Sequence, residues 1–189
     1  MIKIGILGDI GSGKSHVARC FGYPVFNADK EVIKLYKNDL KVFKKLSKSL
    51  PKFIYSFPIN KSEITKAILS NNNNLKKIIK IVHKEVRKKM NAFLRKNKNK
   101  RIVVLDIPLL LENKINNKND ILVFVESKKN DILKRLKNRN NFNKKLYKKF
   151  KDIQSPLSYK KKKSNFIIKN DFSNKSVKKS IKNILNQIT

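Results

Sequence analysis

A glycine-rich segment near the N-terminus has residue types and spacing suited to phosphate binding. Residues Gly8–Ser15 read GDIGSGKS and fit the pattern G-x-x-x-x-G-K-[ST]. Glycines let the backbone curl so that successive N–H groups point at phosphate oxygens, and a following helix adds the positive end of its dipole. Lys14 would place a charge on the β and γ phosphates, and the Ser15 hydroxyl would ligate Mg²⁺. The segment therefore predicts binding of a nucleoside triphosphate together with Mg²⁺.

The elements around this loop are those that the pattern requires. The apolar run Ile2–Leu7 predicts a buried strand before the loop, and a helix is expected to begin at Lys14 or Ser15. Other short apolar runs predict strands at 24–26, 102–105, 121–125 and 166–168, and apolar residues at helical spacing predict helices between them. This alternation predicts an α/β fold, with a parallel central sheet covered by helices on both faces.

Two long helical stretches separate the second and third predicted strands. The first runs from about 30 to 70, interrupted by Pro51 and Pro58, and the second is an amphipathic helix over about 75–96. Because one crossover connection needs much less helix, we expect a helical insertion that holds a second substrate. Arg139–Lys149 is polar and basic, and we expect it to be a mobile segment. A last helix is predicted around 177–188.

Three carboxylates lie near the ends of predicted strands and are candidates for chemistry. Asp29 follows the second strand, where the carboxyl ends of parallel strands converge on one crevice, so it is a candidate for a catalytic role near the γ-phosphate. Helix N-capping explains Asp29 equally well. Asp106 ends the third strand and is either near the metal or a turn residue. For Glu112, an exposed carboxylate is the favoured interpretation.

The charge of the chain is extreme but is not concentrated in one place. The 189 residues carry 47 Lys plus Arg against 13 Asp plus Glu, a formal net charge of +34. Lysines outnumber arginines 41 to 6 and are spread along the chain, and Asn and Ile are also abundant, so A/T-rich codon usage accounts for much of the excess. Selection for a polyanionic partner is the alternative, with Lys160–Lys163 as the nearest approach to a patch.

Composition also excludes several classes of protein. Hydrophobic residues make up 40% of the chain, which excludes full disorder. The one cysteine, Cys20, excludes an internal disulfide framework and fits a reducing compartment. No apolar run approaches the roughly 20 residues of a membrane span, and the N-terminus does not resemble a signal peptide. We therefore expect a cytoplasmic protein with no membrane partner.

Segments along nearly the whole chain resemble the dephospho-coenzyme A kinase family. They occur in the order of the family and with similar gaps. The segments Asp106–Glu112 and Gln154–Lys160 are much more specific to the family than the phosphate loop, which many kinases share. Besides Gly11–Ser15, the segments are Val25–Asp29 (VFNAD, similar to V-I-D-A-D), His83–Arg87 (HKEVR, similar to H-P-x-V-R), Asp106–Glu112 (DIPLLLE, matching D-x-P-L-L-x-E), Gln154–Lys160 (QSPLSYK, similar to Q-x-P-L-x-x-K) and Asn165–Asn170 (NFIIKN, similar to D-F-V-I-x-N).

The resemblance implies a fold and a reaction. Members of the family use ATP to phosphorylate the ribose 3′-hydroxyl of dephospho-coenzyme A, the last step of coenzyme A synthesis. The implied architecture is one P-loop kinase domain of three-layer αβα type. We expect its core at about 1–29, 100–138 and 164–189, a helical acceptor-binding region at about 30–99, and a lid at about 139–163. ATP and Mg²⁺ are the expected cofactors, dephospho-coenzyme A is the expected partner, and a monomer is favoured.

The resemblance also implies roles for individual residues. Asp29 matches the proposed base that takes the hydroxyl proton, and Arg139, with Arg135 before it, would neutralise charge on the transferred group; a solvated helix face is the alternative for both arginines. The residues expected to contact ATP are Gly8, Asp9, Ile10, Gly11, Ser12, Gly13, Lys14, Ser15 and His16, with Lys14 also catalytic and Ser15 on the metal. The residues expected near the acceptor are His83, Arg87, Pro108, Leu109 and Glu112. For His83, capping or partial burial beside Val82 is the commoner interpretation on periodicity alone.

The sequence departs from the family pattern at four places. Asn27 replaces the first aspartate of D-A-D, Lys84 replaces proline, Ser164-Asn165 replaces Ala-Asp, and Asp9 stands where a small residue is usual. An acid beside bound phosphates is unfavourable unless its side chain points away. Lys14, Ser15 and Asp29 are all present, which argues against a P-loop protein kept only as a binding module.

Two other kinds of P-loop protein would fit parts of the sequence. A nucleoside or nucleotide kinase would share the loop, the lid and the topology. A nucleic-acid-binding ATPase would fit the net charge, but aromatic residues are only 8% of the chain and mostly occupy apolar, core-like positions, and arginine is scarce. We therefore expect no specific binding of nucleic acid.

Overall fold

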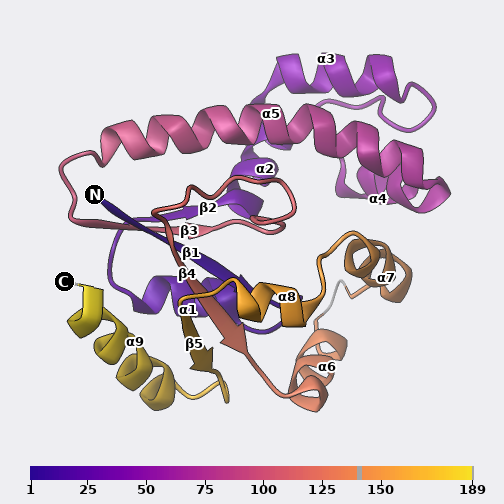
Figure 1. The fold of residues 1–189 in the computed structure, drawn as a ribbon. Helices are drawn as coiled ribbons and strands as arrows, with labels where there is room; N and C mark the ends of the chain where they lie inside the picture. Colours follow the sequence, from indigo (N-terminus) through magenta and orange to yellow (C-terminus); the bar gives the residue numbers. More distant parts are fainter. Residues whose placement is uncertain (140–141, 189) are drawn as a thin grey trace. The chain divides into compact units, whose positions relative to one another are not determined.

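A parallel five-stranded sheet organises the structure, a computed structural model that describes residues 1–139 and 142–188. Residues 140 and 141 of the predicted lid and residue 189 of the predicted core lie outside the described residues. The strand order is β2-β3-β1-β4-β5, and every pairing is parallel (Figure 1). The strands are β1 (Ile2–Gly8), β2 (Val25–Asn27), β3 (Ile102–Asp106), β4 (Ile121–Glu126) and β5 (Phe166–Lys169). All five predicted strands are present, each within a residue or two of its expected bounds.

Helices occupy most of the chain between the strands. Each predicted helix is present, and the stretch from about 30 to 70 forms three helices. Their bounds are α1 (Lys14–Cys20), α2 (Ala28–Asn38), α3 (Leu40–Ser49), α4 (Lys61–Ser70), α5 (Asn72–Lys96), α6 (Lys129–Lys137), α7 (Lys144–Asp152), α8 (Leu157–Lys162) and α9 (Asn174–Ile188). None of the helices within residues 1–139 and 142–188 is long and apolar enough to cross a membrane.

One helix forms where the sequence did not predict a helix. The predicted mobile segment Arg139–Lys149 contains most of α7, and α8 follows it. Between its lysines, α7 carries Leu146, Tyr147 and Phe150, and the helix packs against α4. No side chain of α7 is fully buried, and its three apolar residues lie among five lysines.

The chain divides into two compact units. The first, which we call the sheet unit, comprises Met1–Asn27, Asn97–Phe142 and Ile153–Thr189. The second, the helical unit, comprises Ala28–Lys96 and Asn143–Asp152. The segment predicted as a lid is therefore divided, since α7 belongs to the helical unit and α8 to the sheet unit.

Both faces of the sheet are covered, as near-continuous apolar strands require. On one face, Ile4 and Ile6 of β1 pack with residues of α1 and α9 in the main apolar cluster. Side chains alternate along a strand, so Gly5 points to the other face, where Leu110 and Leu122 lie against it. These layers fix the carboxyl ends of the strands, which carry the candidate site.

One departure from the family pattern supports the sheet edge. Asn165, at the position of the family aspartate, accepts a hydrogen bond from the Leu122 N–H through Oδ1 at 2.8 Å. Its own N–H donates to the Leu122 carbonyl at 2.8 Å. Asparagine therefore supplies an acceptor to the start of β4, as an aspartate could, without adding a charge.

The helical unit is built around α5. This helix packs against α2, α3 and α4, and five of the apolar residues at helical spacing lie in its buried stripe. Those residues are Leu75, Ile78, Val82, Val86 and Met90. The second long helical stretch is thus a single helix of 25 residues, and Lys84, in place of the family proline, lets it continue without interruption.

Candidate active site

The glycine-rich loop joins the end of β1 to the start of α1, as predicted. Gly8, Gly11 and Gly13 have φ angles of 146°, 85° and 90°, a region that side chains rarely adopt. Space is also restricted: a Cβ atom on Gly8 would lie 2.7 Å from the Val125 carbonyl oxygen, and one on Gly13 would lie 2.4 Å from Nδ2 of Asn170. Conformation and packing therefore both require glycine at these positions.

The middle of the loop is held from two neighbouring strands. The carbonyl oxygen of buried Ser12 accepts hydrogen bonds from Asn170 Nδ2 at 2.8 Å and from Ser127 Oγ at 3.0 Å. The Asn170 Oδ1 atom accepts in turn from the Phe172 N–H at 2.9 Å. Sequence reasoning assigned no role to Asn170 or Ser127, although both are polar residues directly after a strand, the position that signals a site in a parallel sheet.

Charged side chains of the loop lie along its backbone. Lys14 Nζ donates to the carbonyl oxygens of Asp9 at 2.7 Å and Gly8 at 3.3 Å. Asp9 Oδ1 accepts from the Ile10 N–H at 2.7 Å, so this unusual acid is engaged with the loop itself. Ser15 and His16 lie in the first turn of α1, and His16 Nε2 is 3.5 Å from the sulfur of Cys20.

Asp106 lies at the carboxyl end of β3, beside the central strand β1. Its carboxylate is buried and accepts a hydrogen bond from the Asn27 amide, its partner in the register of β2 and β3. An aspartate at position 27 would bring two carboxylates together and produce repulsion. Asn27 instead donates a hydrogen bond, so this departure from the family pattern fixes the Asp106 side chain.

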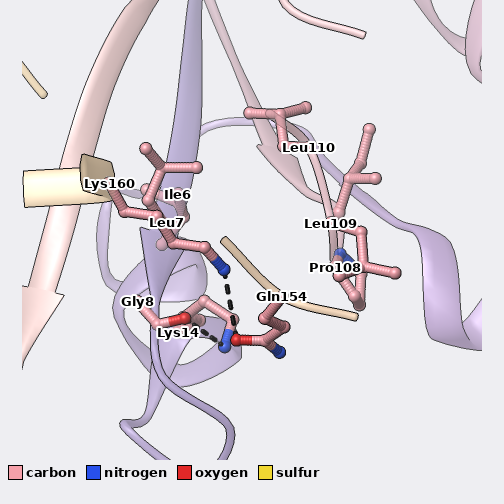
Figure 2. Close-up of a pocket in the computed structure, with 10 residues that line it drawn as sticks. Ile6, Leu7, Gly8, Lys14, Pro108, Leu109, Leu110, Gln154 and Lys160 are labelled. Carbon is pink, nitrogen blue, oxygen red and sulfur yellow. Dashed lines mark hydrogen bonds between the residues drawn. The ribbon is translucent and has the colours of Figure 1, made fainter. Parts of the chain in front are cut away.

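A small pocket opens beside the loop within the sheet unit. Figure 2 shows Gly8 and Lys14 on its loop side and Pro108 and Leu109 across from them. Gln154 and Lys160 also line it. The pocket thus brings together the phosphate loop, part of the predicted acceptor set, and two polar residues to which the sequence assigned no role.

Glu112 does not form an exposed carboxylate, which corrects the interpretation favoured from the sequence. Its side chain is only 12% exposed, and Oε1 accepts from Lys160 Nζ at 2.9 Å and from the Ser155 N–H at 2.8 Å. Burial acts to raise the pKa of this carboxyl, but the hydrogen bonds from the Lys160 ammonium and the backbone outweigh burial and hold the pKa below its usual value. Glu112 is therefore an ionised partner of Lys160.

The arginines around α6 differ in their surroundings. Arg135 is exposed on α6, and its guanidinium lies 4.2 Å from the centre of the Phe172 ring in a cation–π contact. Phe172 is itself 3.4 Å from where a Cβ of Gly13 would lie. Arg139 is exposed just past the end of α6, and its N–H donates to the Leu136 carbonyl at 3.2 Å.

Three of the predicted site residues belong to the helical unit. Asp29 is exposed in the first turn of α2, one residue inside the start of the helix and not at its cap. His83 is half-buried and Arg87 exposed on α5, and their spacing of four residues places them on one face of that helix.

The Mg²⁺ ion that the phosphate loop implies fits the oxygen donor that the loop offers, the Ser15 hydroxyl. Within residues 1–139 and 142–188, no three His, Cys, Asp or Glu side chains gather as a metal cluster. Mg²⁺ in phosphate-transferring sites is held by one or two protein oxygens together with phosphates and water, so a complete protein cage is not expected. The Ser15 hydroxyl, in the first turn of α1, is the protein oxygen that the pattern assigns to it.

Comparison with known proteins extends these observations over the whole chain. The family model for dephospho-CoA kinase matches residues 2–176. A dephospho-CoA kinase of Wolbachia pipientis wMel is 34% identical over 190 residues, covering 98% of this chain and 97% of that protein.

Solved structures agree in fold. The protein TT1252 from Thermus thermophilus has a TM-score of 0.80 at 25% identity, covering 100% of this chain and 98% of its own. Dephospho-CoA kinase from Campylobacter jejuni has a TM-score of 0.62 at 23% identity, covering 99% of this chain and 97% of its own. With a family model that matches most of its length and a relative at 34% identity end to end, the chain belongs to the dephospho-CoA kinase family.

Proposed function

We propose that this protein transfers the γ-phosphoryl group of ATP to the ribose 3′-hydroxyl of dephospho-coenzyme A, giving coenzyme A and ADP. The observation that carries the proposal is the phosphate loop at the end of β1, joined in one pocket to Pro108 and Leu109 of the family segment Asp106–Glu112. The loop supports the use of a nucleoside triphosphate, and membership of the family supports the acceptor.

The loop supplies binding and electrostatic stabilisation. Its N–H groups and the start of α1 surround the phosphates, and Lys14 moves from the loop carbonyls to the β and γ phosphates. The Ser15 hydroxyl would hold Mg²⁺, which would neutralise part of the charge on the phosphates. Arg139 offsets charge on the transferred group.

The acceptor requires a base and a binding surface. Asp29 orients the 3′-hydroxyl and accepts its proton as the oxygen attacks the γ-phosphorus and the bond to the ADP oxygen breaks. Its place inside the first turn of α2 leaves the carboxylate exposed, as this role requires. His83, Arg87, Pro108 and Leu109 are the residues to which we assign binding of the acceptor.

Coupled measurement of ADP release tests the proposal. Purified protein with ATP and Mg²⁺ is given dephospho-coenzyme A, a set of nucleosides, a set of nucleoside monophosphates, or no acceptor. ADP release that depends on dephospho-coenzyme A, with coenzyme A found as product, is expected. Turnover of a nucleoside or nucleotide without turnover of dephospho-coenzyme A would replace the proposal with the related kinase activity.

The oligomeric state, the localisation and the binding partners of the enzyme are predictions from the sequence. We expect a monomer in the cytoplasm with no membrane partner. Any binding of DNA or RNA should be weak, independent of sequence and steeply dependent on salt, because the lysines are scattered. Tight, sequence-selective binding at physiological salt would contradict this expectation.

A further inference from the structure

Lys160 is a buried cation to which the proposed reaction assigns no role. It begins the run Lys160–Lys163, the nearest approach to a basic patch in the sequence, yet it is only 3% exposed. Its neighbour Lys161 is exposed and pairs with Glu126 at 2.7 Å. The run is therefore not a uniform basic surface, and its first residue needs a separate explanation.

Two acceptors hold the Lys160 ammonium in place. Nζ donates to Glu112 Oε1 at 2.9 Å and to Gln154 Oε1 at 3.1 Å. An ammonium has three N–H groups, so a third remains, and no acceptor for it is found among the described residues. On the other side of the pair, Glu112 Oε2 is buried and has no hydrogen-bond partner within residues 1–139 and 142–188.

The position of this pair is as informative as its burial. Lys160 lines the same pocket as Lys14 and Gly8, the residues at the phosphate loop, and Figure 2 shows its ammonium directed into that pocket beside Gln154. Burying an ion pair costs more free energy than burying apolar side chains of similar size unless its hydrogen bonds are complete. An ion pair in which one N–H of the ammonium and one carboxylate oxygen make no hydrogen bond is expected to stabilise the fold little. Its ammonium is, however, able to bind an anion.

We propose that Lys160 is a second phosphate-binding cation, whose ammonium, held by Glu112 and Gln154, binds the terminal phosphate of the triphosphate that Lys14 and the loop bind. The proposal rests on triphosphate binding by the loop, one part of the proposed function, and does not depend on which acceptor is phosphorylated. Charge-assisted hydrogen bonds to phosphate are strong, and a fixed ammonium does not lose rotamer freedom when the ligand arrives.

Binding measurements without any acceptor test this role. Lys160→Met removes the charge and keeps much of the length, and the double variant Glu112→Gln/Lys160→Met removes both charges, so that no carboxylate is left buried alone. Lys161→Met is the matched control. Calorimetric titration with ATP and with AMP, and the melting temperature, are measured for each variant.

The expected pattern separates phosphate binding from a structural role. ATP affinity should fall by about 10- to 100-fold in both Lys160 variants, the usual effect of losing a hydrogen bond to a charged group. AMP, which has no terminal phosphate of this kind, should bind equally to all variants, and Lys161→Met should match the unchanged protein. A double variant that melts normally and binds ATP as tightly as the unchanged protein would overturn the proposal.

The same titration tests the proposed kinase function and the proposed role of Lys160 separately. If the unchanged protein fails to bind ATP, the proposed kinase function is wrong. If the unchanged protein binds ATP and the folded double variant binds it equally well, only the role of Lys160 is wrong.

Discussion

Two glutamates, one in each compact unit, are held ionised in different ways: Glu63 is buried and Glu112 is partly buried. Glu63 of the helical unit is 2% exposed and accepts from the Tyr55 N–H at 3.1 Å, from the Ser56 N–H at 3.4 Å, and from the Ser56 hydroxyl and the Asn60 amide. No cation contributes to these hydrogen bonds. Glu112 of the sheet unit is paired with a buried lysine, and its Oε2 has no hydrogen-bond partner among the residues that the structure describes.

The difference shows how to separate structural charges from functional ones. The donors to Glu63 all come from residues 55–60, so this carboxylate fixes the turn between α3 and α4. The pair Glu112–Lys160 instead reaches the phosphate pocket with unused hydrogen-bonding capacity. We infer that a buried charge with complete partners stabilises the fold, whereas one with incomplete partners beside a pocket binds a ligand.

The largest expected effect is on turnover, and it compares Lys14 of the sheet unit with Asp29 of the helical unit. Lys14 contacts the phosphates before and during transfer, so Lys14→Ala should reduce ATP binding and turnover together. Asp29→Asn removes a charge from the first turn of α2 and should leave the fold and ATP binding nearly unchanged. Its kcat should fall by roughly 10²–10⁴-fold, the usual contribution of a positioned base. Steady-state kinetics and ATP titration of both variants provide the measurement.

Near-normal turnover of Asp29→Asn would remove Asp29 from the chemistry. The search for the base would then move to Asp106, the other carboxylate at a strand end. Because Asp106 is buried and bonded to Asn27, Asp106→Asn would be compared with Asn27→Ala to separate a chemical role from a structural one.

The second prediction tests Glu63 as a structural charge. Glu63→Gln removes the ionised acceptor from its donors in the 55–60 turn, and hydrogen bonds to a charged group contribute about 1.5–3 kcal/mol. For a chain of this length, the melting temperature should fall by about 3–12 °C. Turnover per folded molecule at a permissive temperature should not change. A loss of kcat without a loss of stability would contradict the comparison between the two glutamates.

The pH dependence of that variant gives an independent check. Burial acts to raise the pKa of Glu63, but hydrogen bonds from the Ser56 hydroxyl and the Tyr55 and Ser56 N–H groups lower it below the usual value. A lowered pKa in the folded state means that the stabilisation is complete above the unfolded pKa of about 4.3 and is lost as the pH falls through the folded pKa. The difference in melting temperature between the unchanged protein and Glu63→Gln should therefore narrow below about pH 4.3. A constant difference would show that the charge is not the stabilising feature.

Much of the fold was predictable because its signals are local. Ile102–Asp106 is buried throughout, and a continuous apolar run of that length predicts a strand of a covered parallel sheet. The stripe from Leu75 to Met90 has helical spacing, and it predicts α5 for the same reason. The α7 helix was missed because its apolar residues are few and its lysines dominate the segment.

The candidate site was predictable only where a motif or a strand end marks it. Lys14 and Ser15 belong to such a motif, and Asp106 ends a strand. The burial of Lys160 and Glu112 depends on residues 48 positions apart meeting in space, and nothing in either local sequence shows that the carboxylate meets an ammonium. The same is true of Asn170 and Ser12, which are joined by one hydrogen bond across most of the chain.

The third prediction concerns how the sheet unit holds its loop. Asn170→Ala removes the 2.8 Å hydrogen bond to the Ser12 carbonyl and the acceptor for the Phe172 N–H. A typical hydrogen bond contributes about 0.5–1.5 kcal/mol, so ATP affinity should fall by roughly 2- to 12-fold. Ser127→Ala removes the other, longer hydrogen bond to the same carbonyl and should have a smaller effect. Unchanged ATP titrations in both variants would show that the loop keeps its shape without these donors.

The smallest expected effect tests whether an exposed positive charge away from a pocket contributes to stability or to ATP affinity in this strongly basic protein. Lys45 of the helical unit is 51% exposed and pairs with Glu85 at 3.1 Å, while Lys88 also pairs with Glu85 at 3.0 Å. Exposed pairs contribute about 0.2–1 kcal/mol, and Lys88 remains when Lys45 is removed, so Lys45→Met should lower the melting temperature by no more than about 2–4 °C. The shift should be smaller still at about 1 M salt, where the screening length is roughly 3 Å. Thermal melts at low and high salt measure both effects, and ATP affinity should be unchanged. If Lys45→Met weakened ATP binding as strongly as Lys160→Met, the excess positive charge of the whole chain, and not the buried ammonium beside the loop, would account for attraction of the triphosphate.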